Sequence, residues 1–284
     1  MLKALPPLGS LHAFVLVAET GSLSGAAARL NVTQPAVSKR IRMLESHLHT
    51  ALVSRGSNAL SLTPAGQRYA AAILDALSDI SAATTALESD PAGPLRVSAY
   101  TTLALRWLIP RLPRFKARYP GCEVAVTASL EPIDFSMGQV DAAIRMGTTP
   151  PTRNAEWLLP VTLAPFVAPT RNRSRRGLEG LTLLGSKVQP EYWTVWSAAS
   201  GVTLPGKPLL FESTSMAVQA AIEGLGAVIA PPPFVAAERR QRRLQLADPH
   251  EVPTGEHYWL LLPPGRLRPE LLAFRDWLRE EGTT

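Results

Sequence analysis

Residues 22–48 read SLSGAAARLNVTQPAVSKRIRMLESHL, a pattern that predicts two short helices joined by a tight turn. Ser22 is a suitable N-cap for the first helix, because its hydroxyl can accept a hydrogen bond from a backbone N–H of the first turn. The chain turns at Asn31, and Thr33 is placed to cap the second helix. Pro35 fits the first turn of that helix, where its missing N–H costs nothing. The stretch therefore predicts a helix-turn-helix.

The second helix has two different faces. Its apolar residues recur at intervals of four, three and four, and they are Val37, Ile41, Leu44 and Leu48. Such a stripe faces a core. The residues at the leading end and on the opposite side are Gln34, Pro35, Ala36, Ser38, Lys39 and Arg42. Polar and basic side chains in this arrangement suit base edges and phosphates in a major groove, although an ordinary solvated helix face gives the same pattern.

Basic residues are concentrated in the same part of the chain. Residues 1–65 contain six Lys or Arg against two acids, an excess of +4 within a total net charge of +6. The six are Lys3, Arg29, Lys39, Arg40, Arg42 and Arg55. A local excess of this sign supplies the salt-dependent part of DNA affinity. Arg55 precedes Gly56, Ser57 and Asn58, which predict the turn of a small hairpin or wing; an arginine there can reach DNA or simply be solvated.

These motifs resemble the N-terminal winged helix-turn-helix of LysR-type transcriptional regulators. The matching blocks, within and beyond residues 11–45, are TGSLSGAA (20–27), TQPAVSKRI (33–41), LE (44–45) and LTPAG (62–66). The resemblance implies DNA contacts from the recognition helix through Gln34, Pro35, Ala36, Ser38, Lys39 and Arg42, and from the wing through Arg55. It does not say which bases they read.

A long helix is predicted after Gly66, because no further Gly or Pro follows until after Glu88. Apolar positions in it alternate by three and four, at Ala70, Ile73, Leu77, Ile80, Thr84 and Leu87. This heptad seam favours pairing with a second helix, although a helix packed on its own domain shows the same spacing. The family resemblance implies dimers formed through this linker, and often dimers of dimers. Residues 90–94, DPAGP, then break the helix.

Beyond residue 94 the pattern alternates between strands and helices. Strands are predicted at 95–100, 123–129, 142–146, 227–230 and 258–262, and helices at 103–119, 216–223 and 269–281. Pro110 and Pro113 must bend or segment the first of these helices. Strand–helix–strand repeats imply a mostly parallel sheet with helices on its faces.

The two α/β lobes resemble the effector domain of the same family, which is built like a periplasmic solute-binding protein. RWLIP (106–110), DAAIR (141–145) and FRDWL (274–278) look most like the branch that contains the glycine-cleavage activator and the β-lactamase regulators. The expected fold class is an α winged helix-turn-helix with a linker helix, followed by a two-lobed α/β domain. The expected boundaries are 1–65 for DNA binding, 66–90 for the linker and 91–284 for the effector domain, with lobe I at about 94–167 and 258–284 and lobe II at about 168–257. The segment 168–190 is short for the family.

A ligand site is expected where helix N-termini meet the cleft between the lobes. Thr101 and Thr102 follow the first strand of lobe I, and Ser213, Thr214 and Ser215 occupy the equivalent turn of lobe II. Free N–H groups and the helix dipole at such ends favour an anion, and open α/β sheets bind ligands beyond the carboxyl ends of their strands. Each hydroxyl can also be only a helix cap. Tyr100, Ser129, Arg145 and Phe166 are further candidates, Arg145 either as a counter-ion for the ligand or as a partner of Asp141.

Several classes of protein are disfavoured by the sequence. No apolar run is long enough to span a bilayer, and we expect no secretory signal. The single Cys122 can form no intramolecular disulfide, which suits a reducing cytoplasm. The five His residues form no metal-ligand pattern, and phosphate-loop, dinucleotide-loop and serine-hydrolase motifs are missing.

The sequence thus predicts a cytoplasmic, non-enzymatic LysR-type regulator without cofactor, metal or membrane association. Its expected partners are double-stranded promoter DNA, a small and anionic effector, further copies of itself as a dimer or tetramer, and RNA polymerase. Two alternatives stay open. The first is a solute-binding module whose N-terminal helices serve assembly, and the second is an enzyme that uses the cleft.

Overall fold

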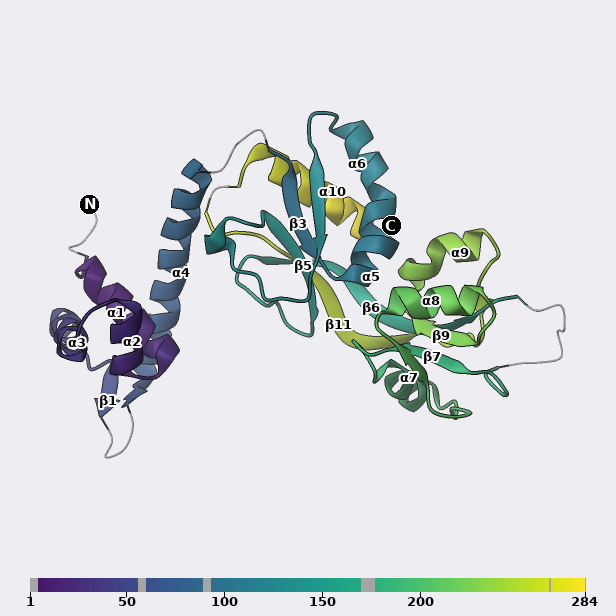
Figure 1. The fold of residues 1–284 in the computed structure, drawn as a ribbon, viewed down its shortest axis with the longest axis horizontal. Coiled ribbons are helices and arrows are strands. Elements are labelled where there is room, and N and C mark those ends of the chain that lie inside the picture. Colours follow the sequence, from purple (N-terminus) through teal and green to yellow (C-terminus); the bar gives the residue numbers. More distant parts are fainter. Residues whose placement is uncertain (1–4, 56–59, 89–92, 170–176, 266, 284) are drawn as a thin grey trace. The chain divides into compact units, whose positions relative to one another are not determined.

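The computed structural model describes residues 5–55, 60–88, 93–169, 177–265 and 267–283 (Figure 1). The chain divides into two compact units, Met1–Glu88 and Ser89–Thr284. Each unit has its own hydrophobic core and is described by itself.

The first unit is helical with a small hairpin. Its elements are α1 (Leu8–Thr20), α2 (Leu23–Arg29), α3 (Gln34–Leu48), β1 (Val53–Arg55), β2 (Leu60–Leu62) and α4 (Pro64–Glu88). The predicted caps are present: the Ser22 hydroxyl accepts a hydrogen bond from the Gly25 N–H at 3.0 Å, and that of Thr33 from the Ala36 N–H at 3.4 Å. The predicted helix-turn-helix is therefore confirmed.

The core of this unit orients α3. Val37, Ile41 and Leu44 are buried in one cluster with Phe14 of α1, as the spacing predicts. The Glu45 carboxylate accepts hydrogen bonds from the N–H groups of Leu52 and Val53, at 2.8 and 3.0 Å, so the end of α3 is bound to the first strand of the hairpin.

The start of α4 packs tightly against the same hairpin. A Cβ at Gly66 would lie 2.1 Å from the Leu52 carbonyl oxygen, so only glycine fits there. Along the helix, Ala70 and Ile73 are buried in the core of the unit, whereas Ile80 is 55% exposed. The first part of the predicted heptad seam therefore packs on its own unit, which is the alternative to pairing with a second helix, whereas Ile80 further along is exposed. The side chain of Leu87 and the predicted break at 90–92 lie outside the described residues.

The second unit contains one curled mixed sheet. Its strands are β3 (Leu95–Ala99), β4 (Val124–Ala128), β5 (Ala142–Gly147), β6 (Ala155–Val167), β7 (Leu183–Ser186), β8 (Leu209–Phe211), β9 (Ala227–Ala230), β10 (Gln245–Leu246) and β11 (Val252–Leu261). The order along the sheet is β4-β3-β5-β11-β6-β9-β7-β8, and β10 pairs with β6.

The sheet is parallel only within each lobe. β3 pairs parallel with β4 and β5, and β7 pairs parallel with β8 and β9. The long strands β6 and β11 pair with each other and with their other neighbours antiparallel, because they cross between the lobes in opposite directions. The prediction of a mostly parallel sheet thus fits each lobe but not the crossing strands.

β11 also begins six residues before the predicted strand. Its pairing with β6 shifts register between Pro253 and His257. Proline and glycine are typical of turns. Pro253 and Gly255 therefore give this irregular part of the strand the sequence pattern of a turn, and the strand is not predicted there.

The helices of the second unit pack on the sheet. They are α5 (Thr101–Leu103), the π-helical η1 (Ala104–Leu108), the 3-10 helix η2 (Ile109–Arg111), α6 (Leu112–Arg118), η3 (Phe135–Met137), α7 (Tyr192–Ser200), α8 (Thr214–Ile222), η4 (Pro232–Val235), α9 (Ala236–Arg240) and α10 (Pro269–Gly282). The predicted segmentation by Pro110 and Pro113 is confirmed as a change from α to π to 3-10 and back to α. Figure 1 shows α6 and α10 side by side, where the rings of Phe115 and Phe274 meet edge to face at 5.3 Å.

Two buried tryptophans fix α7 to β7 and to the segment before β11. The Trp193 indole N–H donates to the Leu184 carbonyl and that of Trp196 to the His250 carbonyl, both at 2.9 Å. Their rings also meet edge to face at 5.9 Å. α7 is thereby held at a fixed position beside the cleft that is described next.

Candidate nucleic-acid interface and ligand cleft

The leading end of α3 presents the residues that were predicted to contact DNA. Gln34, Pro35, Lys39 and Arg42 are exposed, while Ala36 and Ser38 are partly buried. They lie away from the buried stripe of Val37, Ile41 and Leu44. An amide, a hydroxyl and two cations along this side of α3 are the donors and acceptors that a base edge and the phosphates beside it require.

Two other basic residues of the first unit have different surroundings. Arg29 forms an ion pair with Glu19 at 2.7 Å, so its charge is neutralised locally and the excess of +4 comes from other residues. Arg55 ends β1, but its side chain and the turn at 56–59 lie outside the described residues.

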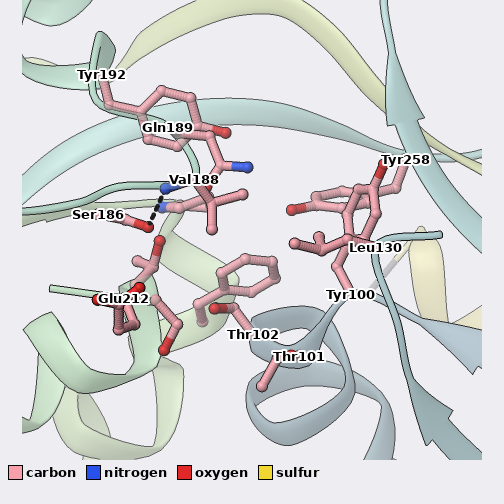
Figure 2. Close-up of a pocket in the computed structure, with 14 residues that line it drawn as sticks. Tyr100, Thr101, Thr102, Leu130, Ser186, Val188, Gln189, Tyr192, Glu212 and Tyr258 are labelled. Atoms are coloured by element: carbon pink, nitrogen blue, oxygen red, sulfur yellow. Dashed lines mark hydrogen bonds between the residues drawn. The ribbon is translucent and has the colours of Figure 1, made fainter.

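A cavity of about 90 Å³ lies between the two lobes of the second unit. Its lining consists of Tyr100, Thr101, Thr102, Leu130, Ser186, Val188, Gln189, Tyr192, Glu212, Ser213, Thr214, Pro231, Phe234 and Tyr258. Figure 2 shows Tyr100 and Tyr258 on one side, with Ser186 and Glu212 opposite. Five of the predicted ligand residues are therefore brought together: Tyr100, Thr101, Thr102, Ser213 and Thr214.

Two helix N-termini border this cavity because each follows a strand of its lobe. Thr101 begins α5 directly after β3 and Tyr100. Ser213 is the N-cap of α8, and its hydroxyl accepts a hydrogen bond from the Met216 N–H at 3.4 Å. The two ends are joined, since the Ser215 N–H donates to the Thr102 hydroxyl at 3.4 Å.

Three predicted residues lie outside the cavity lining. The Ser129 hydroxyl accepts a hydrogen bond from the Glu131 N–H at 3.0 Å. Phe166 is fully buried in the core of lobe II. Ser215 is buried in the first turn of α8, two residues after the cap, and its hydroxyl oxygen has no hydrogen-bond partner among the described residues.

Arg145 also lies outside the lining, although it contacts a residue of the cavity wall. Its guanidinium is buried and stacks on the Tyr100 ring at 5.2 Å. It donates to the Ser98 carbonyl and hydroxyl, at 3.2 and 2.9 Å, and to the Glu131 carbonyl at 3.1 Å. Burial lowers the pKa of Arg145. Because these acceptors are neutral, the cation adds positive potential behind Tyr100.

Asp141 is not the partner of Arg145. Its carboxylate pairs instead with Arg96 at 2.9 Å and with Arg268 at 3.1 Å. This ion triad binds the start of β5 to β3 and to the residue before α10.

Sequence reasoning missed nine lining residues. They are Leu130, Ser186, Val188, Gln189, Tyr192, Glu212, Pro231, Phe234 and Tyr258. A signal existed for some: Ser186 ends β7 and Pro231 follows β9, and the carboxyl ends of strands border ligand sites in such sheets. Tyr192 and Tyr258 come from α7 and from a crossing strand, whose approach to the cleft only the three-dimensional pairing reveals.

Hydroxyl groups dominate the chemistry of the lining. Burial raises the pKa of Tyr192 and of Tyr258, so both phenols stay protonated and can donate hydrogen bonds. Among the described lining residues Glu212 has the one charged side chain, and Lys187 pairs with it. The described residues contain no group of three His, Cys, Asp or Glu side chains suited to a metal ion. None of the helices described is both long and apolar enough to cross a membrane.

Comparisons with known proteins identify a family for both units of the chain. A family model described as "LysR substrate binding domain" matches residues 88–283, and one described as "Bacterial regulatory helix-turn-helix protein, lysR family" matches residues 8–67. The AhcY transcriptional activator HvrB of Rhodobacter capsulatus is 31% identical over 98% of this chain and 98% of its own. The glycine cleavage system transcriptional activator of Escherichia coli K12 is 32% identical over 98% of this chain and 94% of its own.

A solved structure is similar to the second unit. The effector domain of the transcriptional regulator AmpR of Pseudomonas aeruginosa superposes with a TM-score of 0.56 at 28% identity, and the match covers 68% of this chain and 96% of that domain. The relatives named here are regulators of transcription.

Proposed function

The chain belongs to the LysR family of bacterial transcriptional regulators, and from this premise we propose that a small carboxylate bound in the cleft controls how α3 reads promoter DNA. The protein is a DNA-binding regulator with a helix-turn-helix domain and an effector-binding domain. The observation that supports the nature of the effector is the cavity between the two helix N-termini, with five of its hydroxyl-bearing residues at those ends.

The proposed DNA contacts divide into two kinds. Gln34 and Ser38 read base edges, because their side chains can both donate and accept hydrogen bonds near the leading end of the helix. Lys39 and Arg42 bind phosphates and position the helix in the groove. Pro35 and Ala36 contact the groove by shape, and Arg55 reaches the DNA from the wing.

Three features support an anionic effector. The N-terminal ends of α5 and α8 present backbone N–H groups and the positive ends of their dipoles. The hydroxyls of Thr101 and Ser213 add donors beside them. Arg145 contributes a buried positive charge behind Tyr100.

The cavity also limits the size of the group that it encloses. Its volume of about 90 Å³ is several times the roughly 10–15 Å³ that a single water molecule needs, so it admits a small organic group. A carboxylate with a short carbon chain fills that space, and the apolar faces of Leu130, Val188 and Phe234 cover the carbons.

A second copy of the chain is the proposed partner of α4. Leu74 is 43% exposed beside the part of α4 that packs on the core, and Ile80 is 55% exposed beyond Leu77, which still packs against that core. Large apolar side chains at such positions are covered when two helices pair. The effector then acts by linkage. It shifts the equilibrium between two arrangements of the paired DNA-binding units only by the difference between its affinities for them.

Binding to DNA upstream of the gene tests the first part of this proposal. We expect selective binding relative to a scrambled duplex of equal length, surviving moderate salt. Weak and equal binding to both duplexes would support the solute-binding alternative instead.

A matched pair of small molecules tests the effector. Propionate should raise the melting temperature of the full-length protein, whereas propionamide, which has nearly the same shape but no charge, should not. An equal shift with both compounds would contradict the anionic site.

A further inference from the structure

Ser215 in the first turn of α8 is bonded to a single helix of the opposite lobe through both of its backbone groups. Its N–H donates to the Thr102 hydroxyl at 3.4 Å, and its carbonyl accepts from the Arg106 guanidinium at 3.2 Å. Thr102 and Arg106 lie four residues apart, and therefore on one face of the helix formed by α5 and η1. The first turn of α8 is thus docked at two points, one on α5 and one on η1.

The same guanidinium makes an ion pair across the lobes. Arg106 contacts the Glu238 carboxylate of α9 at 2.6 Å, and the two side chains are only 15% and 8% exposed. A short, largely desolvated contact between an arginine and a carboxylate is strong and directional. Removing one partner leaves the other charge buried and uncompensated.

Arg106 lies where its helix departs from regular geometry. It belongs to the π-helical turn η1, and Pro110 cannot donate a hydrogen bond to the Arg106 carbonyl four residues before it. Single π-helical turns of this kind occur frequently at functional sites. Arg106 does not line the cavity, whereas Thr102, Ser213 and Thr214 do.

We propose that Arg106 is a positioning residue of the effector site. By holding Glu238 and the Ser215 carbonyl together, it fixes the N-terminus of α8 opposite that of α5, so the cavity between them is formed before a ligand arrives. The affinity for the effector then depends on an ion pair that the effector never touches. The inference rests on the proposed function only in treating this cavity as the effector site.

Hydrogen exchange of the full-length protein tests the positioning directly and needs no ligand. In Arg106→Met we expect the amides of residues 215–217 to exchange about 10-fold faster or more, because their docking on α5 is lost. Arg106→Lys keeps a cation for Glu238, but an ammonium group lacks the forked donors that reach the Glu238 carboxylate and the Ser215 carbonyl together. An intermediate exchange rate is therefore expected. Arg243→Met is the matched control: Arg243 also lies near Glu238, at 3.6 Å, but on the same lobe and half exposed.

Each outcome decides for or against the inference. Faster exchange confined to the ends of α8 and α5, in the order Met, Lys, wild type, supports it. Unchanged exchange there, or an equal change in Arg243→Met, overturns it. If Arg106→Met does not fold, Arg106→Lys and Glu238→Gln decide by the same rates.

Propionate separates this inference from the proposed function. Weaker propionate binding in Arg106→Met, with DNA binding retained, supports both. If wild-type protein binds no propionate, the proposed anionic effector fails, and the exchange rates still decide whether Arg106 positions α8.

Discussion

Replacing Arg42 by Ala should change the salt dependence of DNA binding by a definite amount. Arg42 is exposed on the outer side of α3. One phosphate contact contributes about 0.9 to the slope of log affinity against log salt, so a dimer that loses two contacts should lose about 1.8. At about 0.1 M salt this corresponds to about 8-fold weaker binding per contact and about 60-fold for the pair. Specific and random duplexes should lose affinity alike, because phosphates carry no sequence information.

Arg29→Ala is the matched control for this prediction. It removes the same charge from the same unit, but Arg29 is already paired with Glu19 at 2.7 Å. We therefore expect little change in its slope. Fluorescence anisotropy with a labelled upstream duplex and a scrambled duplex, at about 50 to about 300 mM salt, measures both slopes. Equal slope changes in the two variants would show that only net charge matters, and would refute a phosphate contact by Arg42.

Three further predictions concern the base-reading residues, the ligand cap and the ion triad. Gln34→Ala and Ser38→Ala should each cost about 1 to 3 kcal/mol of discrimination between the upstream and scrambled duplexes, with little change in slope, and unchanged discrimination in competition assays would exclude base contacts. Ser213→Ala should weaken propionate binding and lower stability by about 1 kcal/mol through loss of the α8 cap, whereas Thr101→Val, which removes no cap bond, should weaken binding alone; calorimetry and denaturation separate the two. Burial raises the pKa of Asp141, but hydrogen bonds from Arg96 and the charge of Arg268 outweigh burial and hold this pKa below its ordinary value. The ionised form thus stabilises the fold above the unfolded pKa, and this contribution is lost as pH falls through the folded pKa. Asp141→Asn should be destabilised at neutral pH, and denaturant titrations should show the gap closing below about pH 4.

Local signals were sufficient to predict the helix-turn-helix of the first unit from sequence. Its caps, Ser22 and Thr33, and the stripe of Val37, Ile41 and Leu44 act within one or two turns of helix. Each such feature is decided by neighbours in the chain, so spacing alone reveals it. The seam on α4 was ambiguous because a core position and a position that pairs with another chain have the same period.

The clearest sequence signal for the cleft is a residue that connects a strand to the start of a helix. Thr101 and Ser213 are such residues, and both line the cavity. Tyr258 reaches it because β11 pairs with both β5 and β6, a register that no local pattern reports. Phe166 lies in a stretch of β6 that is buried on both faces, so neither face of the strand there opens on the cleft.

Arg145 shows why charge alone misleads in such a site. From the sequence a carboxylate partner or an anionic ligand are the natural alternatives, but the guanidinium is held by the Ser98 hydroxyl and by carbonyl groups. Neutral acceptors are present on every segment of backbone, so sequence does not single them out.

The place of β11 in the sheet has a consequence for biosynthesis. This strand lies between β5 and β6, yet it is the last strand of the sheet to leave the ribosome, and α10, which completes the core around Phe115, follows it. The first unit can fold while the rest of the chain is still being made, whereas lobe I has an open seam until translation is nearly complete. A message truncated before codon 252 would therefore yield a DNA-binding unit joined to a sheet in which β5 and β6 each have an unpaired edge. Unpaired strand edges promote aggregation, so we expect this product to aggregate or be degraded rather than to bind DNA without regulation.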